Sequence, residues 1–318
     1  MENYKQKVSI ILLNYNGYED SISCLQSLQK ISYINYDVII VDNASLDISM
    51  DKILAYMQEN DIEYVFYDTP ENAMSKSLNA KVSLIQSCFN GGYGYGNNIG
   101  IKYALMHGAD YVLILNNDTV VDHEFLEPMV QVCEDDLSIG IASGKIYFHD
   151  KPDTIWFNGG GYNQYTGKVE HFNFKEKDIG QVPKAPITFI TGCMWLIPSK
   201  VFKTIGFINE EYFMYTEDLE YCQRLIQGGY TLKVIENGAV YHKVGSCTGG
   251  QYSSFSVFWR TRNMNKLIVS NKCFFRRFSA FLVFNLKTIM QLVKAKKLTM
   301  LKYYFKAIFS VWKDDNAT

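Results

Sequence analysis

Short apolar segments alternate with longer amphipathic segments in the first part of the chain. The apolar segments at residues 8–13, 37–42 and 63–67 predict strands. The segments between them, at about 20–30 and 48–59, place apolar side chains three or four residues apart and predict helices. This alternation of strands and helices is typical of an α/β protein with a doubly wound, mainly parallel sheet.

The clearest strand signal is at residues 111–115, where five aromatic or aliphatic residues follow one another and end in Asn116-Asn117-Asp118. An unbroken apolar run of this length predicts a buried strand of a parallel sheet. In such sheets ligands bind beyond the carboxyl ends of the strands. An oxygen-rich cluster there can hold a hard cation that in turn holds phosphates. The alternative is that these residues form a turn and cap the next helix.

A glycine-rich stretch at residues 90–100 leads into a predicted helix that continues to about His107. It does not fit the dinucleotide-binding pattern, because after Gly94 and Gly96 the third glycine, Gly100, comes one residue late. One interpretation is a flexible backbone that approaches a nucleotide or sugar closely. The other is a tight connection without a ligand. Before this stretch, we interpret residues 69–80 as a loop insertion and 82–87 as a possible strand.

The second half of the chain mixes strands and helices less regularly. The pattern predicts helices at residues 122–134, 199–205 and 217–226, with Thr216 as the N-cap of the last and Gly228-Gly229 at its end. Strands are predicted at 139–148 and 230–236, and a hairpin or ordered loops at 156–170. Residues 183–198 contain an apolar strand that Thr191-Gly192-Cys193 interrupts.

Length and composition fit a folded protein of one large domain, or of one domain with a sizeable appendage. The chain has 318 residues, of which 47% are hydrophobic, so disorder is not expected. Its seven cysteines are scattered singly, which indicates reduced thiols in a cytosolic protein rather than a disulfide framework or a zinc site. We expect no signal peptide, and no uncharged apolar run has the length of a membrane span.

The charge is divided unevenly along the chain. Residues 251–318 contain 13 Lys and Arg against two acidic residues, a net charge of about +11, and the totals of 31 and 33 leave about −13 for residues 1–250. We therefore predict an acidic globular domain at 1–250, which divides at about residue 120 into parts at 1–120 and 121–250. A basic helical appendage follows at 251–318.

The appendage is predicted to form two amphipathic helices between residues 273 and 312. A basic amphipathic helix with aromatic side chains on one face suits the surface of an anionic membrane. The alternatives are that the helices pack on the catalytic domain or form a homodimer interface. Nucleic acid is not expected as a partner, because no recognition motif is present. The predicted apolar stripes comprise Phe274, Phe278, Phe281, Leu282, Ile289 and Leu292, then Leu298, Leu301, Phe305, Ile308 and Trp312, with Lys297, Lys302, Lys306 and Lys313 beside the second stripe.

Four polar clusters follow predicted strands or loops: residues 14–16, 42–45, 116–118 and 217–218. The first three should converge on one sheet edge by topology. Asp42 can accept a hydrogen bond from a base imide, and Tyr15 offers an aromatic face for stacking. Asp118 is the only carboxylate of its triplet, so a cation there would be held partly by diphosphate oxygens.

Glu217 and Asp218 open a helix, where the macrodipole stabilises a carboxylate. An ionised carboxylate near a reacting centre can take a proton from an attacking hydroxyl. The alternative is an ordinary pair of N-terminal helix acids. His242 is a candidate ligand for metal or phosphate, or else a structural histidine.

In order and spacing together, these motifs resemble the inverting glycosyltransferases of family two, which have the glycosyltransferase A fold. The chain is most similar to the rhamnosyltransferase-like branch. The resemblance extends from residue 8 to about residue 265. It rests on Asn14-Tyr-Asn16, Asp42-Asn-Ala-Ser45, residues 90–100, Asn116-Asn-Asp118, Thr191-Gly-Cys193, Phe213-Met-Tyr-Thr-Glu-Asp218, Arg224, His242-Lys-Val-Gly-Ser246 and Arg262-Asn263.

The resemblance implies a role for each matching position. Asp218 would be the catalytic base, with Glu217 beside it, and Asp118 and His242 would face Mg²⁺ or Mn²⁺. Three departures are Asn116 in place of the first aspartate of the metal motif, Gln223 where relatives often carry tryptophan, and Pro198-Ser199 where many carry a basic residue. The remaining positions would bind nucleotide (Asn14, Tyr15, Asn16, Asp42, Asn43, Ser45, Asn98, Asn116 and Asn117) and acceptor or diphosphate (Thr191, Gly192, Arg224 and Arg262).

The expected function is transfer of a sugar, with inversion, from a nucleotide sugar to a saccharide or lipid-linked acceptor in surface polysaccharide synthesis. By analogy with the branch, dTDP-L-rhamnose is the first donor and a UDP-hexose the second. The expected location is cytoplasmic, peripheral on the inner face of the membrane. One alternative is a sugar nucleotidyltransferase, but residues 14–17 lack the basic residue that a triphosphate loop needs. The other is a non-catalytic nucleotide- or glycan-binding adaptor, which the carboxylates at 118, 217 and 218 argue against.

Overall fold

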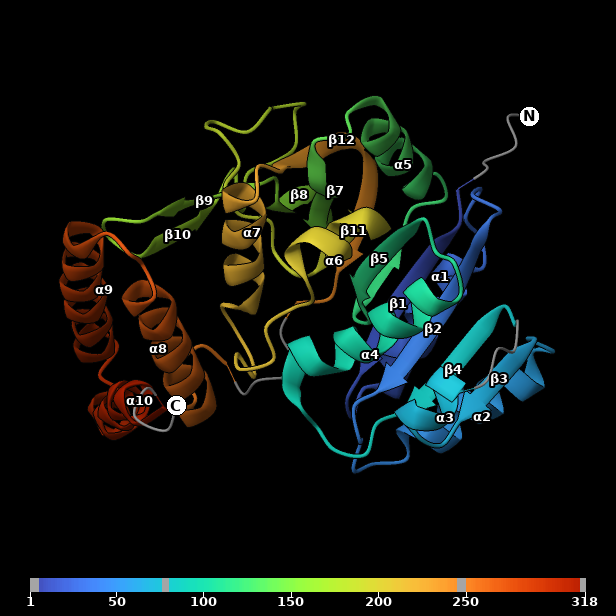
Figure 1. The fold of residues 1–318 in the computed structure, drawn as a ribbon, viewed down its shortest axis with the longest axis horizontal. Helices are drawn as coiled ribbons and strands as arrows, with labels where there is room; N and C mark the ends of the chain where they lie inside the picture. The colour runs from blue at the N-terminus through green and yellow to red at the C-terminus, as the bar shows by residue number, and fades with distance from the viewer. Residues whose placement is uncertain (1–5, 76–79, 245–249, 315–318) are drawn as a thin grey trace.

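A computed structural model describes the backbone of residues 6–75, 80–244 and 250–314, and the side chains of these residues up to 311. Within this part of the chain, ten of the strands form one sheet in the order β3-β4-β2-β1-β5-β11-β7-β12-β6, with β8 paired to β7. A separate hairpin, β9–β10, extends from the sheet towards three C-terminal helices (Figure 1).

The first half of the sheet is parallel throughout, as predicted. It consists of β1 (Val8–Asn14), β2 (Tyr36–Asp42), β3 (Tyr64–Tyr67), β4 (Val82–Gln86) and β5 (Tyr111–Asn116). The connecting helices are α1 (Tyr18–Leu28), α2 (Ser49–Glu59), α3 (Pro70–Ser75) and α4 (Gly92–Met106). The predicted loop insertion at 69–80 is partly wrong, because α3 occupies its first half; Pro70 fits the first turn of a helix, where its missing N–H costs nothing. Residues 76–79 lie outside the described chain.

The second half adds antiparallel strands. β11 is antiparallel to β5 and β7, whereas β12 is parallel to β7. The hairpin expected at 156–170 is present as β9–β10, and the interrupted strand at 183–198 is regular only after residue 193. The elements are β6 (Thr119–Val121), α5 (Leu126–Asp135), β7 (Ile139–Phe148), β8 (Lys151–Phe157), β9 (Gly160–Asn163), β10 (Lys168–His171), β11 (Met194–Pro198), α6 (Ser199–Ile205), α7 (Glu217–Gln227) and β12 (Thr231–His242).

The glycine-rich stretch is helical rather than a flexible loop, so that interpretation is wrong. A Cβ at Gly96 would lie 2.3 Å from Leu13, and one at Gly100 would lie 2.7 Å from Ile11. Both contacts are with β1, and real Cβ atoms do not come this close. The glycines therefore let α4 approach the sheet more closely than other residues would allow.

The C-terminal region contains one more helix than predicted. α8 (Ser254–Val269) precedes α9 (Phe274–Lys294), which is followed by the 3₁₀ turn η1 (Leu298–Met300) and α10 (Leu301–Asp314). Met264 and Ile268 of α8 belong to the main hydrophobic core, as does Ala280 of α9. The domain boundary at residue 250 remains a prediction. α8, which follows this boundary, packs against residues of the domain that precedes it.

The helices α9 and α10 each bury one side and expose another. Leu292 and Tyr304 pack with Val257 of α8 in a second, smaller core. Asn265 and Asn285 donate hydrogen bonds to each other, and the Tyr304 hydroxyl donates to Asn285, so a buried polar network ties the three helices together.

The predicted apolar stripes therefore do not form one surface. Phe281, Ile289, Leu301 and Ile308 are partly buried, whereas Phe274, Phe278, Leu282, Leu298 and Phe305 are exposed. Packing against α8 covers one face, which the apolar spacing alone does not identify. The side chains of Trp312 and Lys313 lie outside the description. Among the described helices, none combines the length and apolarity needed to cross a bilayer.

Candidate active site

The loops after β1 and β2 are joined by a dense hydrogen-bond network centred on Asp42. This side chain is fully buried. Its Oδ1 accepts from Asn14 Nδ2 at 2.7 Å and from the Ser45 hydroxyl at 2.6 Å, and its Oδ2 accepts from the Ser45 backbone N–H at 2.9 Å. The prediction that Asp42 meets a base imide is therefore corrected, because both oxygens already hold the loop in shape.

Other predicted nucleotide-binding residues belong to the same network. The Ser45 hydroxyl accepts from the Asn16 backbone N–H, and Asn16 Oδ1 accepts from the Leu46 N–H. Asn43 donates to Asn90 and to the Gly92 carbonyl, which ties the β2 loop to the start of α4. Tyr15, by contrast, is 39% exposed, so its ring remains available for the predicted stacking on a base.

The network continues to the loop after β5. Asn117 Nδ2 donates to the Ser21 hydroxyl at 2.8 Å, and that hydroxyl donates to Asn14 Oδ1 at 2.7 Å. On its other side, the Asn116 N–H donates to the Cys193 carbonyl at 2.9 Å. The structure thus brings together the three predicted loops and connects them to residues 191–193.

Asp118 and His242, distant in sequence, are in contact. The pairing of β6 with β12 sets Thr119 opposite His242, and His242 Nε2 lies 3.1 Å from the Asp118 carboxylate. The Trp156 ring packs edge-on against the His242 imidazole with ring centroids 4.4 Å apart. Sequence reasoning missed Trp156, because nothing in its local pattern indicates this contact.

Oδ1 of Asp118 lies 3.1 Å from His242 Nε2 but makes no hydrogen bond of good geometry among the described residues, and His242 Nδ1, on the other side of the imidazole, has no hydrogen-bond partner there. In the described chain no group of three or more His, Cys, Asp or Glu side chains could hold a metal ion. One carboxylate and one imidazole fit a divalent cation that takes its other ligands from water and a diphosphate, as Mg²⁺ usually does.

Glu217 and Asp218 begin α7 beside residues 191–193. Asp218 Oδ1 accepts from the Leu219 N–H at 2.8 Å, and its Oδ2 accepts from the Gly192 N–H at 3.3 Å. Burial raises the pKa of Asp218 to about 6 even though these amides favour the carboxylate. Burial and the adjacent Asp218 charge raise the pKa of Glu217 well above its usual value, and its Oε2 is buried without a partner among the described residues. Burial thus raises the pKa of both carboxyls, and at Glu217 the neighbouring Asp218 charge further favours the protonated form.

The turn before this pair is strained. Tyr215 and Thr216 both have left-handed backbone conformations, with φ of 68° and 75°. Such conformations are rare for residues other than glycine and are kept only where the surroundings impose them. Asn263 of α8, fully buried, donates to the carbonyls of Met214 and Tyr215 at 2.9 Å each. Thr216 is the N-cap residue of α7, as predicted, although its side chain makes no capping hydrogen bond.

The turn is also fixed from α4. The Tyr93 N–H donates to the Phe213 carbonyl at 2.9 Å, and the Tyr93 hydroxyl donates to the Gly192 carbonyl. Gly192 therefore lies between Tyr93 and Asp218, and Thr191 beside it is buried. Sequence reasoning did not single out Tyr93, although it sits within the glycine-rich motif.

Three predicted site residues have other contacts. Asn98 is buried and exchanges hydrogen bonds with Ile208 while also donating to Glu210, so we correct its nucleotide-binding prediction to a structural role. Arg224 pairs with Glu220 and donates to the carbonyls of Ile205 and Phe207, away from Asp218, so it too is structural here. Arg262 donates to the Glu211 carbonyl and to Asn263, next to the strained turn.

The cation whose charge affects the pKa of Asp218 is instead Arg260, a residue that the sequence did not single out. Its charge lowers the pKa of Asp218 and so opposes the effect of burial. Its guanidinium lies over the Tyr215 ring, 4.6 Å from the centroid.

The fold is shared with solved glycosyltransferases. The mannosyltransferase PcManGT from Pyrobaculum calidifontis, in complex with GDP-Man and Mn²⁺, matches with a TM-score of 0.57 at 12% identity over 98% of this chain and 76% of that one. S. aureus TarS 1–349 in complex with UDP matches with a TM-score of 0.51 at 17% identity over 88% and 71%. This chain spans 43% of the longer TarS chain. These likenesses define the fold of the chain, which is the glycosyltransferase A fold.

The sequence then identifies the family. Residues 9–206 match the profile described as Glycosyl transferase family 2, and residues 111–305 match Glycosyl transferase family group 2. The chain belongs to glycosyltransferase family 2, which confirms the resemblance and decides against a nucleotidyltransferase or a binding adaptor.

Two curated relatives resemble most of the chain. The "Low-salt glycan biosynthesis hexosyltransferase Agl10" of Haloferax volcanii is 24% identical over 84% of this chain and 76% of its own. The "dTDP-rhamnosyl transferase RfbF" of Shigella flexneri is 26% identical over 66% and 69%. The protein is therefore a glycosyltransferase by family.

Proposed function

We propose that this enzyme transfers L-rhamnose from dTDP-L-rhamnose, or in second place a hexose from a UDP-hexose, to a saccharide or lipid-linked acceptor in surface polysaccharide synthesis. The similarity to RfbF supports the first donor, and the UDP complex of TarS supports the second. The observation that carries the proposal is the position of Asp218. This ionisable carboxyl is connected through Gly192, Cys193 and Asn116 to the loop of Asp118.

Asp218 acts as the base. It accepts the proton of the acceptor hydroxyl while that oxygen forms a bond to the anomeric carbon. The bond from this carbon to the donor diphosphate breaks on the opposite face, and its electron pair leaves with the nucleoside diphosphate, so the configuration inverts. Glu217 stays protonated, so no second negative charge lies beside the Asp218 carboxylate.

Asp118 and His242 would hold the divalent cation, Mg²⁺ or Mn²⁺. When bound, the cation neutralises charge that develops on the departing diphosphate. The Mn²⁺ in the PcManGT complex supports this proposal. The donor nucleotide would lie over the loops of Asn14–Asn16 and Asp42–Ser45, with Tyr15 against its base.

The test is nucleoside diphosphate release from dTDP-L-rhamnose and from a panel of UDP-hexoses, measured for the native enzyme and Asp218→Asn. We expect one donor to be used and the variant to lose about 10³-fold or more in turnover while binding that donor normally. A matched control is Asp135→Asn at the exposed end of α5, which should be fully active. Near-native turnover by Asp218→Asn would refute the assignment of the base.

We further propose that the enzyme is peripheral on the inner, cytoplasmic face of the membrane through α9 and α10. The support is an exposed apolar face on α9, with lysines of α9 and α10 exposed around it. Such a surface suits the interface of an anionic leaflet. The exposed apolar side chains are Phe274, Phe275, Phe278, Leu282, Leu286, Met290 and Val293 of α9, and Phe305 and Phe309 of α10.

Cosedimentation with anionic vesicles tests this location. Phe275→Ser and Leu286→Ser together should weaken vesicle binding at low salt by about 100-fold, since each substitution removes an apolar side chain from the interface. Leu137→Ser, at an equally exposed apolar residue of the catalytic part, is the control and should bind as the native protein does. If the native protein does not sediment with the vesicles, the proposal fails.

A further inference from the structure

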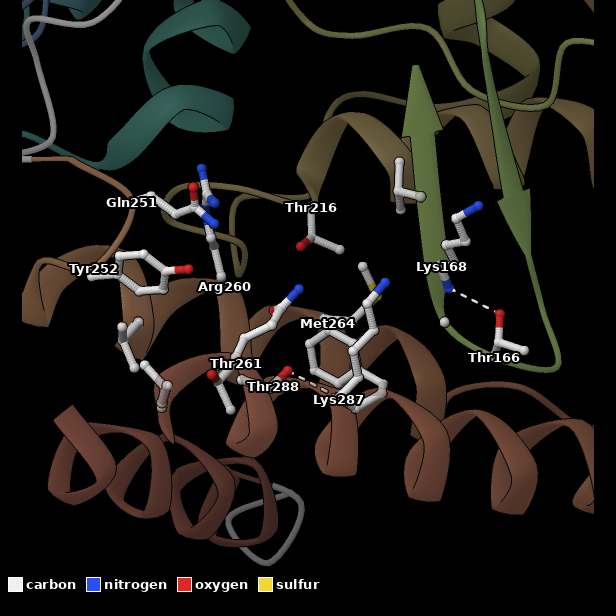
Figure 2. A pocket seen from close by; sticks show the side chains of 16 residues that line it. Thr166, Lys168, Thr216, Gln251, Tyr252, Arg260, Thr261, Met264, Lys287 and Thr288 are labelled. Atoms are coloured by element: carbon white, nitrogen blue, oxygen red, sulfur yellow. Dashed lines mark hydrogen bonds between the residues drawn. The ribbon is translucent and has the colours of Figure 1, made fainter. Parts of the chain in front are cut away.

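A cavity of about 360 Å³ is lined by Thr216, the residue before the Glu217–Asp218 pair, and by Arg260. It lies between the β9–β10 hairpin, α8 and α9, and its wall includes Thr216 (Figure 2). Thr216 is two residues before Asp218, and the cavity therefore begins where the strained turn presents the base. Its volume is in the range of small-ligand sites.

The charged side chains of this cavity are all basic. Arg260, Lys287 and Lys168 line it, and none of its lining residues is acidic. Lys168 pairs with Glu170 at the hairpin. Within the described chain, neither Arg260 nor Lys287 has a carboxylate partner, and Figure 2 shows both side chains rising from α8 and α9 towards the segment that carries Thr216. Two unpaired cations that face one cavity favour an anionic ligand.

The rest of the lining suits a phosphate that carries a larger group. Gln251 and Gln291 supply amide donors near the two cations. Met264, Phe284 and Leu292 supply an apolar wall on the other side. A phosphate ester or diphosphate presents oxygens to such cations and donors, while the apolar wall accommodates whatever the phosphate is attached to.

Resting on the proposed function, in which Asp218 activates the acceptor, we propose that this cavity binds a phosphate group of the acceptor. Arg260 and Lys287 hold the phosphate, and the sugar hydroxyl then reaches Asp218 across Thr216. Arg260 links the two sites directly, because its charge is also felt by Asp218. The phosphate belongs to a lipid diphosphate or to a phosphodiester in a glycan polymer, and both present the same chemistry.

Binding of phosphate compounds is measured in EDTA. Because EDTA removes divalent cations, the proposed metal-dependent donor site should not bind diphosphate, and the measurement reports on the cavity. The probes are inorganic pyrophosphate, farnesyl diphosphate and a glycerol phosphate oligomer, each titrated into the full chain by calorimetry. We expect measurable binding, weakened about tenfold by Arg260→Gln and by Lys287→Gln. Tighter binding of farnesyl diphosphate than of pyrophosphate points to a lipid source, and tighter binding of the oligomer points to a polymer.

The matched control is Lys294→Gln, which removes the same charge from an exposed position of α9 outside the cavity. It should bind every probe as the native protein does, and so should Asp118→Ala. Absence of binding in EDTA, or an equal loss in Lys294→Gln, overturns the proposal. The outcome is independent of the base assignment, because turnover by Asp218→Asn can succeed or fail without any change in these affinities.

Discussion

The two sides of the active site are built in opposite ways. On the donor side, the loops of Asn14, Asp42 and Asn117 satisfy each other's hydrogen bonds, and Asp42 has no contact with solvent. On the acceptor side, Glu217 has an unpaired buried oxygen, and Asp218 has a raised pKa. The backbone before them is strained at Tyr215 and Thr216.

The difference agrees with the proposed role of Asp218 in the reaction. A dense polar network such as the one around Asp42 fixes a shape and stabilises the fold, so these loops would offer a preformed surface to the proposed nucleotide. Buried carboxyls with raised pKa values and strained backbone cost stability, and proteins keep such features mainly where a reaction needs them. The following predictions test this contrast, from the largest expected effect to the smallest.

Asp42→Ala should destabilise the protein by about 3 kcal/mol, because the buried Asn14 amide loses its shorter hydrogen bond and the Ser45 hydroxyl and N–H lose their acceptors. Urea unfolding measures this change. Asp51→Ala, an exposed position of α2, is the control and should change stability by less than about 0.5 kcal/mol. If Asp42→Ala is as stable as the native protein but no longer binds the donor, Asp42 has its predicted role of accepting a hydrogen bond from the nucleotide base.

Asn263→Ala should lower kcat by about 30-fold, or about 2 kcal/mol, because the turn at Tyr215 and Thr216 loses the two hydrogen bonds that hold it. Donor affinity should stay native, since Asn263 acts only by positioning α7. Steady-state kinetics with separate measurement of donor binding distinguishes the two. A weakened donor with unchanged kcat would contradict the positioning role.

Asp118→Ala should weaken nucleotide-sugar binding about tenfold in the presence of Mg²⁺ or Mn²⁺, because the carboxylate supplies one of the ligands of the cation. In chelator the variant and the native protein should bind equally weakly. Calorimetry under both conditions makes the comparison. An equal loss in chelator would indicate that Asp118 only shapes the turn after β5.

The activity at limiting substrate should rise about fourfold from pH 5.5 to pH 7.5, as a base with a pKa of about 6 becomes ionised. A flat profile over this range would argue against Asp218 as the base.

Stability should change in the opposite direction. The folded pKa of Asp218 lies above its ordinary value of 3.8. The folded protein therefore binds more protons than the unfolded chain between about pH 4 and 6, and stability falls as the pH rises through this window. Asp218→Asn should reduce this dependence and leave the part that comes from Glu217, whose pKa is also raised by burial; urea unfolding at pH 4 and pH 8 can measure the change.

The fold was largely predictable because its signals are local. The apolar runs of β1, β2 and β5 and the polar residues after them report both the strands and the edge where ligands bind. Parallel pairing brings these ends together whatever the details of packing. The contact between Asp118 and His242 was anticipated only through the family resemblance, since β6 and β12 are far apart in the chain.

The predictions that were wrong share one cause. The residues that contact a side chain in the fold lie far from it in the sequence. The glycine-rich composition of α4 is typical of a flexible loop. In the fold, the side chains of β1 leave no room for a Cβ atom at Gly96 or Gly100. The apolar spacing in α9 and α10 correctly predicts helices, but it does not identify the side of each helix that packs against α8. Asn98 and Arg224 match motif positions, yet nearby backbone carbonyls take their donors.

The sequence by itself determined the order of the elements, the family and the identity of the polar clusters, because these follow from periodicity and spacing along the chain. Only the tertiary structure decided which carboxyls are held by neighbours and which are left to react. That distinction depends on burial and on donors from distant segments, such as Gly192 and Arg260 around Asp218. A pKa reflects the whole surroundings of a group, which form only when the chain folds.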